Sequence, residues 1–195
     1  MSKRTAVVER RTAETNIELR LVLDGKGEAD VSTGLGFLDH MLTALARHGR
    51  FDLLLRCDGD LEVDDHHTVE DCALALGEAL DDALGERRGI ARFGHAYAPL
   101  DEALARVVID LSGRPAPVVD LSLRRDQIGQ VACENLHHFF VSLANRARAS
   151  IHVDVLRGDN DHHRVEAAFK ALALALRRAV AQDGSDEVPS TKGVL

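Results

Sequence analysis

Three adjacent pairs of histidines stand out in this sequence of 195 residues. The pairs are His66 with His67, His137 with His138, and His162 with His163. Two of the pairs open the same pattern, HHxxE, because Glu70 follows the first pair and Glu166 follows the third. Residues four apart lie on one face of a helix, so His66 with Glu70, and His162 with Glu166, can each hold one metal ion. The repeated pattern therefore predicts two metal-binding sites.

The second histidine of each pattern, His67 or His163, is rotated by about a hundred degrees around the helix from the first. We expect it to serve a different ion, shared with another part of an assembly. His40 precedes the first pattern by 26 residues and His138 precedes the second by 24, in equivalent positions of the two halves. These two histidines would complete the sets, giving two sites of about three imidazoles and one carboxylate each.

The combination of imidazole and carboxylate suits a borderline divalent ion such as manganese, iron or zinc, and a carboxylate with open positions is less typical of a closed structural zinc site. The spacing alone does not identify the metal. Cys57, Cys72 and Cys133 are far apart and show no CxxC spacing. A disulfide framework or a thiolate zinc site is therefore not expected.

A second group of residues could bind phosphate. Arg92 in ARFG and Arg114 in DLSGRP stand at expected strand or loop edges, where a guanidinium can bind phosphate bidentately. Lys170 follows Glu166 by four residues, so it is either an anion ligand or a salt-bridge partner. The segment PSTKG near the C-terminus has the features of an anion-binding lid, with three polar side chains: Ser190, Thr191 and Lys192.

Elements that could position these residues follow from the hydrophobic periodicity. Alternation of apolar and polar residues predicts strands, and apolar residues at intervals of three and four predict helices. The first half of the chain reads as strands 5–10 and 17–23, helix 36–49, strand 51–57 and helix 66–84. Its order is therefore β-β-α-β-α.

The second half repeats this order. It reads as strands 91–100, 103–111 and 118–123, helix 131–147, strand 150–156, helix 162–181 and a loop-like tail 183–195. DDHHTVED at 64–71 also matches NDHHRVEA at 160–167. We predict a single α/β (α+β) domain of two similar halves, about residues 1–90 and 91–182, with pseudo-two-fold symmetry. Each half would be a sheet covered on one face by two helices.

The composition limits the partners. The chain carries 24 basic and 32 acidic residues, a net charge of −8. A surface with this charge repels nucleic acid and anionic lipid, so any anionic substrate needs a local basic pocket. No apolar run is long enough to span a membrane. We therefore expect a cytoplasmic protein that binds neither nucleic acid nor membranes.

Five segments give the chain a close resemblance to the imidazoleglycerol-phosphate dehydratases. They are GFLDHML at 36–42, DDHHTVED at 64–71, DLSGRP at 110–115, NDHHRVEAAFKA at 160–171 and PSTKG at 189–193. These matches span nearly the whole chain, and the paired HHxxE motifs are highly specific. The sequence contains no fused phosphatase domain of the kind that some members carry, so the monofunctional form is expected.

The resemblance implies a fold of the ribosomal protein S5 domain 2-like type and a pair of manganese ions per active site, other divalent ions being possible. It also implies homo-oligomers, in which trimers build a 24-subunit shell with active sites shared between subunits. The implied metal ligands are His40, His66, His67, Glu70, His138, His162, His163 and Glu166. Sharing between neighbours would explain why adjacent histidines face different ions.

The reaction that the resemblance implies is the loss of water from imidazole glycerol phosphate, which gives imidazole acetol phosphate in histidine biosynthesis. The proton to be removed has little acidity, and a metal-bound imidazolate could expel the neighbouring hydroxyl and make that proton acidic. Glu14 matches a glutamate that contacts the substrate in the family and is the candidate acid/base. The residues implied for binding phosphate or orienting the glycerol chain are Arg92, Arg114, Lys170, Ser190, Thr191 and Lys192.

Two other functions fit the same residue types. A dinuclear metal-dependent phosphate hydrolase would also use histidines, carboxylates and basic phosphate ligands. Alternatively, the metals could clamp a non-catalytic oligomer. Dehydration leaves phosphate on the product, whereas hydrolysis releases it, and only an enzyme would lose turnover when Glu14 is replaced.

Overall fold

The first half of the chain forms a four-stranded sheet in the computed structural model, which describes residues 4–193 and 195. Its strands are β1 (Thr5–Arg11), β2 (Thr15–Val22), β3 (Ala29–Ser32) and β4 (Asp52–Gly59). They lie in the order β1-β2-β4-β3. The pairs β1-β2 and β2-β4 are antiparallel, and β3 adds to β4 in parallel at the edge.

The second half builds a sheet of the same design. Its strands are β5 (Phe93–Leu100), β6 (Ala103–Asp110), β7 (Ala116–Asp120) and β10 (Ser150–Arg157). Their order is β5-β6-β10-β7, again with one parallel strand at the edge. A short hairpin of β8 (Gln127–Ile128) and β9 (Val131–Ala132) precedes the third helix. The strand order and directions therefore repeat between the halves.

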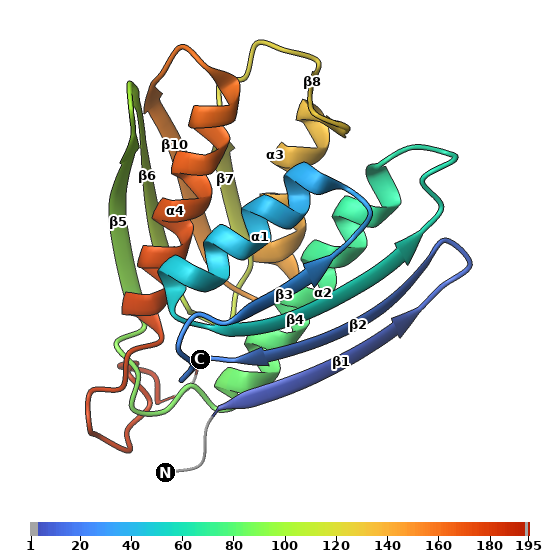
Figure 1. Ribbon diagram of the computed structural model, residues 1–195. Coiled ribbons are helices and arrows are strands. Elements are labelled where there is room, and N and C mark those ends of the chain that lie inside the picture. The colour runs from blue at the N-terminus through green and yellow to red at the C-terminus, as the bar shows by residue number, and fades with distance from the viewer. Residues whose placement is uncertain (1–3, 194) are drawn as a thin grey trace.

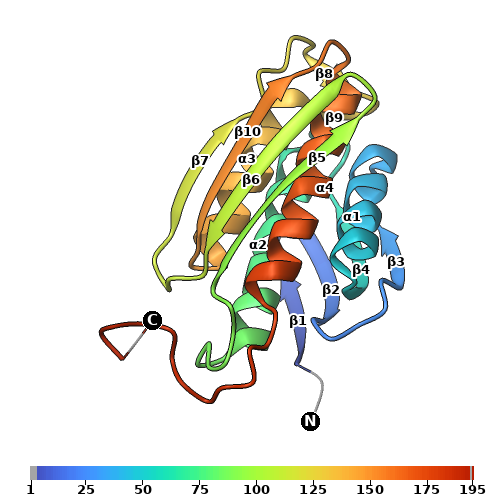
Figure 2. The ribbon, with the colours of Figure 1, turned by 90° about the vertical axis from the view of Figure 1, so that its left-hand side faces the viewer.

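Four helices fill the space between the two sheets: α1 (Gly36–Gly49), α2 (His66–Leu84), α3 (Cys133–Arg146) and α4 (Asp161–Ala179). Helices α1 and α2 cover the first sheet, and α3 and α4 cover the second (Figures 1 and 2). Across the interface between the halves, α2 packs against α3 and α1 packs against α4. The predicted fold class, a duplicated unit with two helices on one face of each sheet, is confirmed.

The core forms because both kinds of element are apolar on one side. In β2 the buried positions alternate from Thr15 to Leu21, with Ile17, Leu19 and Leu21 turned toward the helices. Between the helices, Phe139 and Phe140 of α3 contact Phe169 of α4, with ring centroids 5.1 and 4.9 Å away. No helix among the described residues combines the length and the apolar character needed to cross a membrane.

Several boundaries differ from the sequence-based expectations. Strand β3 was not expected, because four residues with only half-buried alternation give a weak periodic signal. Helix α3 begins at Cys133 rather than at 131, since Val131 and Ala132 pair with β8. Helix α4 begins at Asp161 and ends at Ala179, two residues before the expected end at 181. The two halves are joined through residues 85–92, between α2 and β5.

Candidate functional site

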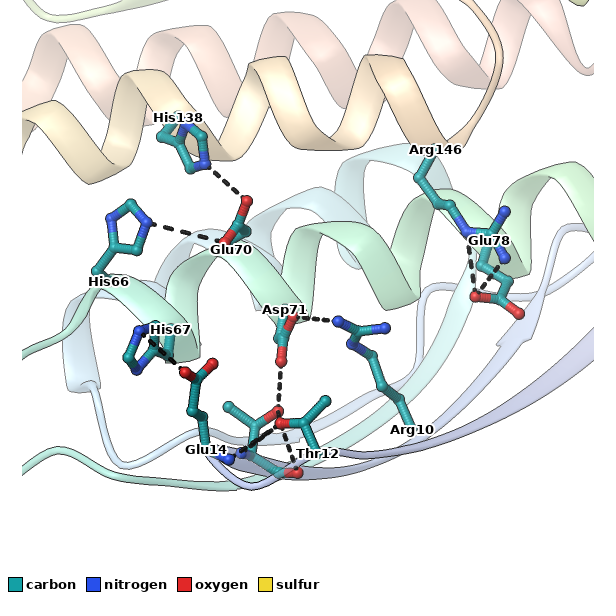
Figure 3. Close-up of polar contacts among 11 residues, drawn as sticks. Arg10, Thr12, Glu14, His66, His67, Glu70, Asp71, Glu78, His138 and Arg146 are labelled. Carbon is teal, nitrogen blue, oxygen red and sulfur yellow. Dashed lines mark hydrogen bonds and ion pairs between the residues drawn. The ribbon is translucent and has the colours of Figure 1, made fainter.

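The first HHxxE motif lies at the N-terminal end of α2 and meets a histidine of α3. The Nε2 atom of His138 lies 3.0 Å from Oε1 of Glu70, and Nε2 of His66 lies 3.8 Å from Oε2 of the same carboxylate. The rings of His66 and His138 are stacked, with centroids 5.1 Å apart. The three side chains converge from two helices (Figure 3). We call His66, Glu70 and His138 the first cluster.

The second motif forms an equivalent group at the N-terminal end of α4. Nε2 of His162 and Nε2 of His40, from α1, each lie 3.2 Å from Oε2 of Glu166. One carboxylate oxygen therefore faces both imidazoles. We call His40, His162 and Glu166 the second cluster.

The two clusters draw their ligands crosswise from the halves of the chain. The first takes two residues from α2 and its third from α3 of the second half, whereas the second takes two from α4 and its third from α1 of the first half. This follows from the packing of α2 on α3 and of α1 on α4. Neither half alone contains a complete cluster.

The geometry of both clusters fits a divalent cation. In each, one ligand atom from every residue lies within 4.8 Å of the others. Two imidazoles and a carboxylate are the donors that manganese, iron and zinc accept, and three protein ligands leave further coordination positions open. The Nδ1 atom of His66 lies 2.9 Å from the amide oxygen of the buried Asn135. That hydrogen bond leaves Nε2 of His66 free to face the cluster.

The second histidine of each motif lies outside its cluster, as its rotation around the helix predicted. Nδ1 of His67 lies 3.0 Å from Asp60 and its Nε2 lies 3.6 Å from Glu14. The hydrogen bond to Asp60 raises the pKa of His67. The second motif has the same arrangement, because Nδ1 of His163 lies 2.8 Å from Glu102. In each motif, therefore, a carboxylate from outside the motif fixes Nδ1 of the second histidine.

Hydrogen bonds also keep Glu102 ionised. The backbone N–H groups of Asn160 and Asp159, together with His163, donate to its carboxylate. These bonds lower the pKa of Glu102 to about 2, and the bond from the backbone N–H of Asn160 has the largest effect. The side chain that orients His163 is therefore held in place by the two residues that precede α4.

Lys170 lies with the second cluster. Its Nζ is 2.7 Å from Oε1 of Glu166, and both side chains are largely buried. Burial, the largest single effect, would raise the pKa of Glu166, but hydrogen bonds from Lys170 and His40 outweigh it and lower this pKa to about 2. Of the two interpretations of Lys170, the structure shows the salt bridge.

Glu14 occupies the turn between β1 and β2, beside His67. The hydroxyl of Thr12 accepts hydrogen bonds from the backbone N–H groups of Glu14 and Thr15, at 3.1 and 2.9 Å. Thr15 in turn donates to the buried carboxylate of Asp71, at 2.5 Å. Because Asp71 follows Glu70 in α2, this hydrogen bond attaches the turn that carries Glu14 to the helix that carries Glu70 (Figure 3).

Most of the candidate phosphate ligands lie at the other end of α4. The backbone N–H of Arg92 donates to Ala179, the last residue of the helix, and its guanidinium binds both oxygens of Asp110 and the carbonyl of Pro189. The exposed Arg114 follows Gly113, which lies against the backbone of Leu195. The tail with Ser190, Thr191 and Lys192 is at this end of the molecule (Figure 2).

Within one chain these phosphate candidates do not meet the first or the second cluster. Helix α4 has 19 residues and is about 27 Å long, with His162 at its start and Ala179 at its end. Glu14, His66, His67, Glu70 and His138 lie together around the start of α2 (Figure 3), whereas the tail lies at the other end of the molecule from the start of α4 (Figure 2).

Three residues that orient the histidines were missed in the sequence. Glu102 is 61 residues from His163, and Asp60, although only seven residues before His67, lies in the loop before α2, where no helical spacing marks it. Asn135 precedes His138 by three residues on one face of α3, which was the available signal. The neighbouring Glu134 is exposed and belongs to neither cluster.

Comparisons with known proteins agree with the resemblance in the sequence. The family model described as imidazoleglycerol-phosphate dehydratase matches residues 33–176. The dehydratase of this name from Salinibacter ruber is 57% identical over 195 residues, which cover 100% of this chain and 96% of the relative. The one from Candida glabrata is 57% identical over 208 residues, covering 97% and 99%. A Phytophthora nicotianae relative is 60% identical over 192 residues, but the chain spans 42% of its length.

Two solved structures resemble the fold closely. The crystal structure of imidazoleglycerol-phosphate dehydratase from Staphylococcus aureus has a TM-score of 0.82 at 34% identity, covering 91% of this chain and 99% of the other. The enzyme from Pyrococcus furiosus, solved in complex with (S)-C348, has a TM-score of 0.82 at 40% identity, covering 96% and 100%.

Proposed function

Because this chain belongs to the imidazoleglycerol-phosphate dehydratase family, a family of hydro-lyases, we propose that it removes water from imidazole glycerol phosphate. The product is imidazole acetol phosphate, an intermediate of histidine biosynthesis in the cytoplasm. The observation that carries this proposal is the pair of histidine and carboxylate clusters at the starts of α2 and α4, with Glu14 beside the first.

The two clusters would hold one divalent cation each, with manganese as the proposed ion. His67 and His163 would complete the sites of neighbouring copies, because each keeps Nε2 on the side away from its orienting carboxylate. When bound, the two cations withdraw electron density from the imidazole ring of the substrate and so lower the pKa of its ring N–H.

Glu14 is proposed to take the carbinol proton. Its carboxylate is half exposed, lies beside His67 and stands on a turn that Thr12 and Asp71 hold in place. A carboxylate positioned in this way can accept a proton from carbon while the neighbouring hydroxyl, protonated from solvent, leaves as water. Glu14 then releases its proton to solvent, which replaces the proton that the hydroxyl consumed. The enol that remains loses its O–H proton and gains one on carbon, which gives the ketone.

Arg92, Arg114 and the tail residues are proposed to bind the phosphate of the substrate. Arginine matches a phosphate with two parallel hydrogen bonds, and Ser190, Thr191 and Lys192 add exposed donors. Since these groups lie at the far end of α4 from the second cluster, one chain cannot supply a whole site. This separation supports homo-oligomers with shared sites, and trimers that build a 24-mer are the proposed assembly.

The function is tested by incubating the purified protein with imidazole glycerol phosphate, with and without a chelator. Without chelator, we expect a phosphorylated ketone as the product and no release of inorganic phosphate. With chelator, we expect the activity to be lost and the protein to form a smaller assembly. Release of phosphate would favour the hydrolase instead. Full activity in rigorously metal-free protein would contradict the mechanism.

A further inference from the structure

The two metal clusters are equivalent by sequence but have different surroundings. When His66 is aligned with His162 and Glu70 with Glu166, Leu74 aligns with Lys170. When His40 is aligned with His138, Phe37 aligns with Asn135. At both aligned positions one cluster has an apolar side chain and the other has a polar one.

The first difference concerns the carboxylate ligand. Glu166 presents Oε2 to its two histidines, and its Oε1 is bound by the ammonium of Lys170 at 2.7 Å. Glu70 presents one oxygen to His138 and the other to His66. Among the described residues, no lysine or arginine pairs with Glu70, since the uncharged Leu74 occupies the equivalent position.

The second difference concerns the histidine at the start of each motif. Asn135 accepts a hydrogen bond from Nδ1 of His66, which fixes the tautomer with the lone pair on Nε2. At the equivalent place, the ring of Phe37 packs edge-on against His162, with centroids 5.1 Å apart. A phenyl ring offers no acceptor in the plane of the imidazole, so it does not select the tautomer of His162.

From these differences we propose that the first cluster binds its divalent cation more tightly than the second, so that the two sites fill in order. Lys170 is the main cause. Its positive charge opposes a cation at the second cluster and neutralises part of the carboxylate charge that would attract it. The inference rests on the proposed function only in requiring that both clusters hold divalent ions.

The test is a titration of metal-depleted protein with Mn²⁺, in which electron paramagnetic resonance measures the free ion. Two classes of site are expected in the unaltered protein. Lys170→Met should raise the affinity of the weaker class by roughly tenfold and leave the stronger class unchanged. Glu166→Gln should weaken or remove the weaker class, and Glu70→Gln the stronger one, which assigns each class to its cluster.

A mirror substitution provides the matched control. Leu74→Lys places an ammonium four residues after Glu70, as Lys170 follows Glu166, and should lower the affinity of the stronger class. Lys170→Arg keeps the charge and should preserve the difference between the classes. Light scattering on the same samples restricts the comparison to proteins of equal assembly size, because assembly could itself change the affinity. If Lys170→Met does not fold, the result of Leu74→Lys decides.

Two outcomes would overturn the inference without touching the proposed function. One is a single class of two equal sites in the unaltered protein with full dehydratase activity. The other is two classes that neither Lys170→Met nor Leu74→Lys changes. Absence of Mn²⁺ binding at both clusters, together with absence of dehydratase activity, would contradict the proposed function as well.

Discussion

Glu14 is the residue on which the proposed proton transfer depends. Replacing Glu14 with Gln keeps the size of the side chain and its place in the turn but removes the group that accepts a proton. We expect turnover to fall by about 10²- to 10⁴-fold. Metal content, measured by elemental analysis, should stay unchanged. Glu9→Gln, an exposed change on the neighbouring strand, should keep full activity. Normal turnover in Glu14→Gln would rule out this role.

Asp60 is expected to act through His67. Its carboxylate holds Nδ1 of that ring at 3.0 Å, so Asp60→Ala would leave the imidazole free to rotate. Loss of such a supporting hydrogen bond typically lowers metal affinity by about 10- to 100-fold. Binding of Mn²⁺ should show this loss, while Asp58→Ala, an exposed change near the end of β4, should bind normally. Equal affinities for the two variants would mean that Asp60 does not position a ligand.

Among the single residues of the site, the sequence predicted those that are close to one another along the chain. Glu70 lies one turn after His66, and Glu166 lies one turn after His162, so the spacing alone indicated that each pair shares a face. The residues that support the ligands could not be predicted in that way. Asp60 reaches His67 through the loop that joins β4 to α2, and a loop has no regular period to read. Asn135 reaches His66 only after α3 has packed against α2.

Among the helices, α2 and α3 come unusually close at Gly77. A Cβ atom at this position would lie 2.8 Å from Cβ of Arg146 and 2.9 Å from the backbone of Ala147 and Leu143. Alanine favours a helix over glycine by about 1 kcal/mol, yet here the added methyl group must push the two helices apart. We expect Gly77→Ala to lower the free energy of unfolding by about 1–3 kcal/mol, as overpacking does.

Denaturant unfolding of metal-free protein measures this change without a contribution from bound ions. Gly36→Ala is the matched control, because Gly36 is the first residue of α1 and a Cβ atom there would meet no atom within 4 Å. This variant should be as stable as the original protein or slightly more stable. Equal stability of the two variants would contradict the account of helix packing.

Elements with a strong period were the ones that the sequence predicted well. Helix α2 begins at His66 and ends at Leu84, as expected, because its buried positions recur at three and four residues throughout. The short strand β3 was not predicted. Nor did the sequence predict that each cluster takes its third ligand from the other half of the chain. The repeat places His40 and His138 in equivalent positions, but only the packing of α1 on α4 decides which motif His40 joins.

In the whole molecule, the two ends of α4 carry different parts of the proposed site. If sites are shared between subunits, chains with different defects should complement one another. We expect Glu14→Gln and the exposed change Arg114→Ala each to be nearly inactive alone. In mixed assemblies made by co-expression, a shared site is intact only when its Glu14 comes from the Arg114→Ala chain and its Arg114 from the Glu14→Gln chain. Random mixing of equal amounts makes about one site in four intact, so about a quarter of the activity should return. Activity no greater than that of the separate variants would contradict shared sites.

The crosswise clusters also have a consequence for the history of the chain. A protein made of one half alone would contain a motif and a third histidine that could not reach each other, so it would have needed a second chain of its own kind to bind any ion. Having both halves in one chain makes that encounter independent of protein concentration. It also allows each half to change separately, and the aligned positions of Leu74 and Lys170 hold different residues.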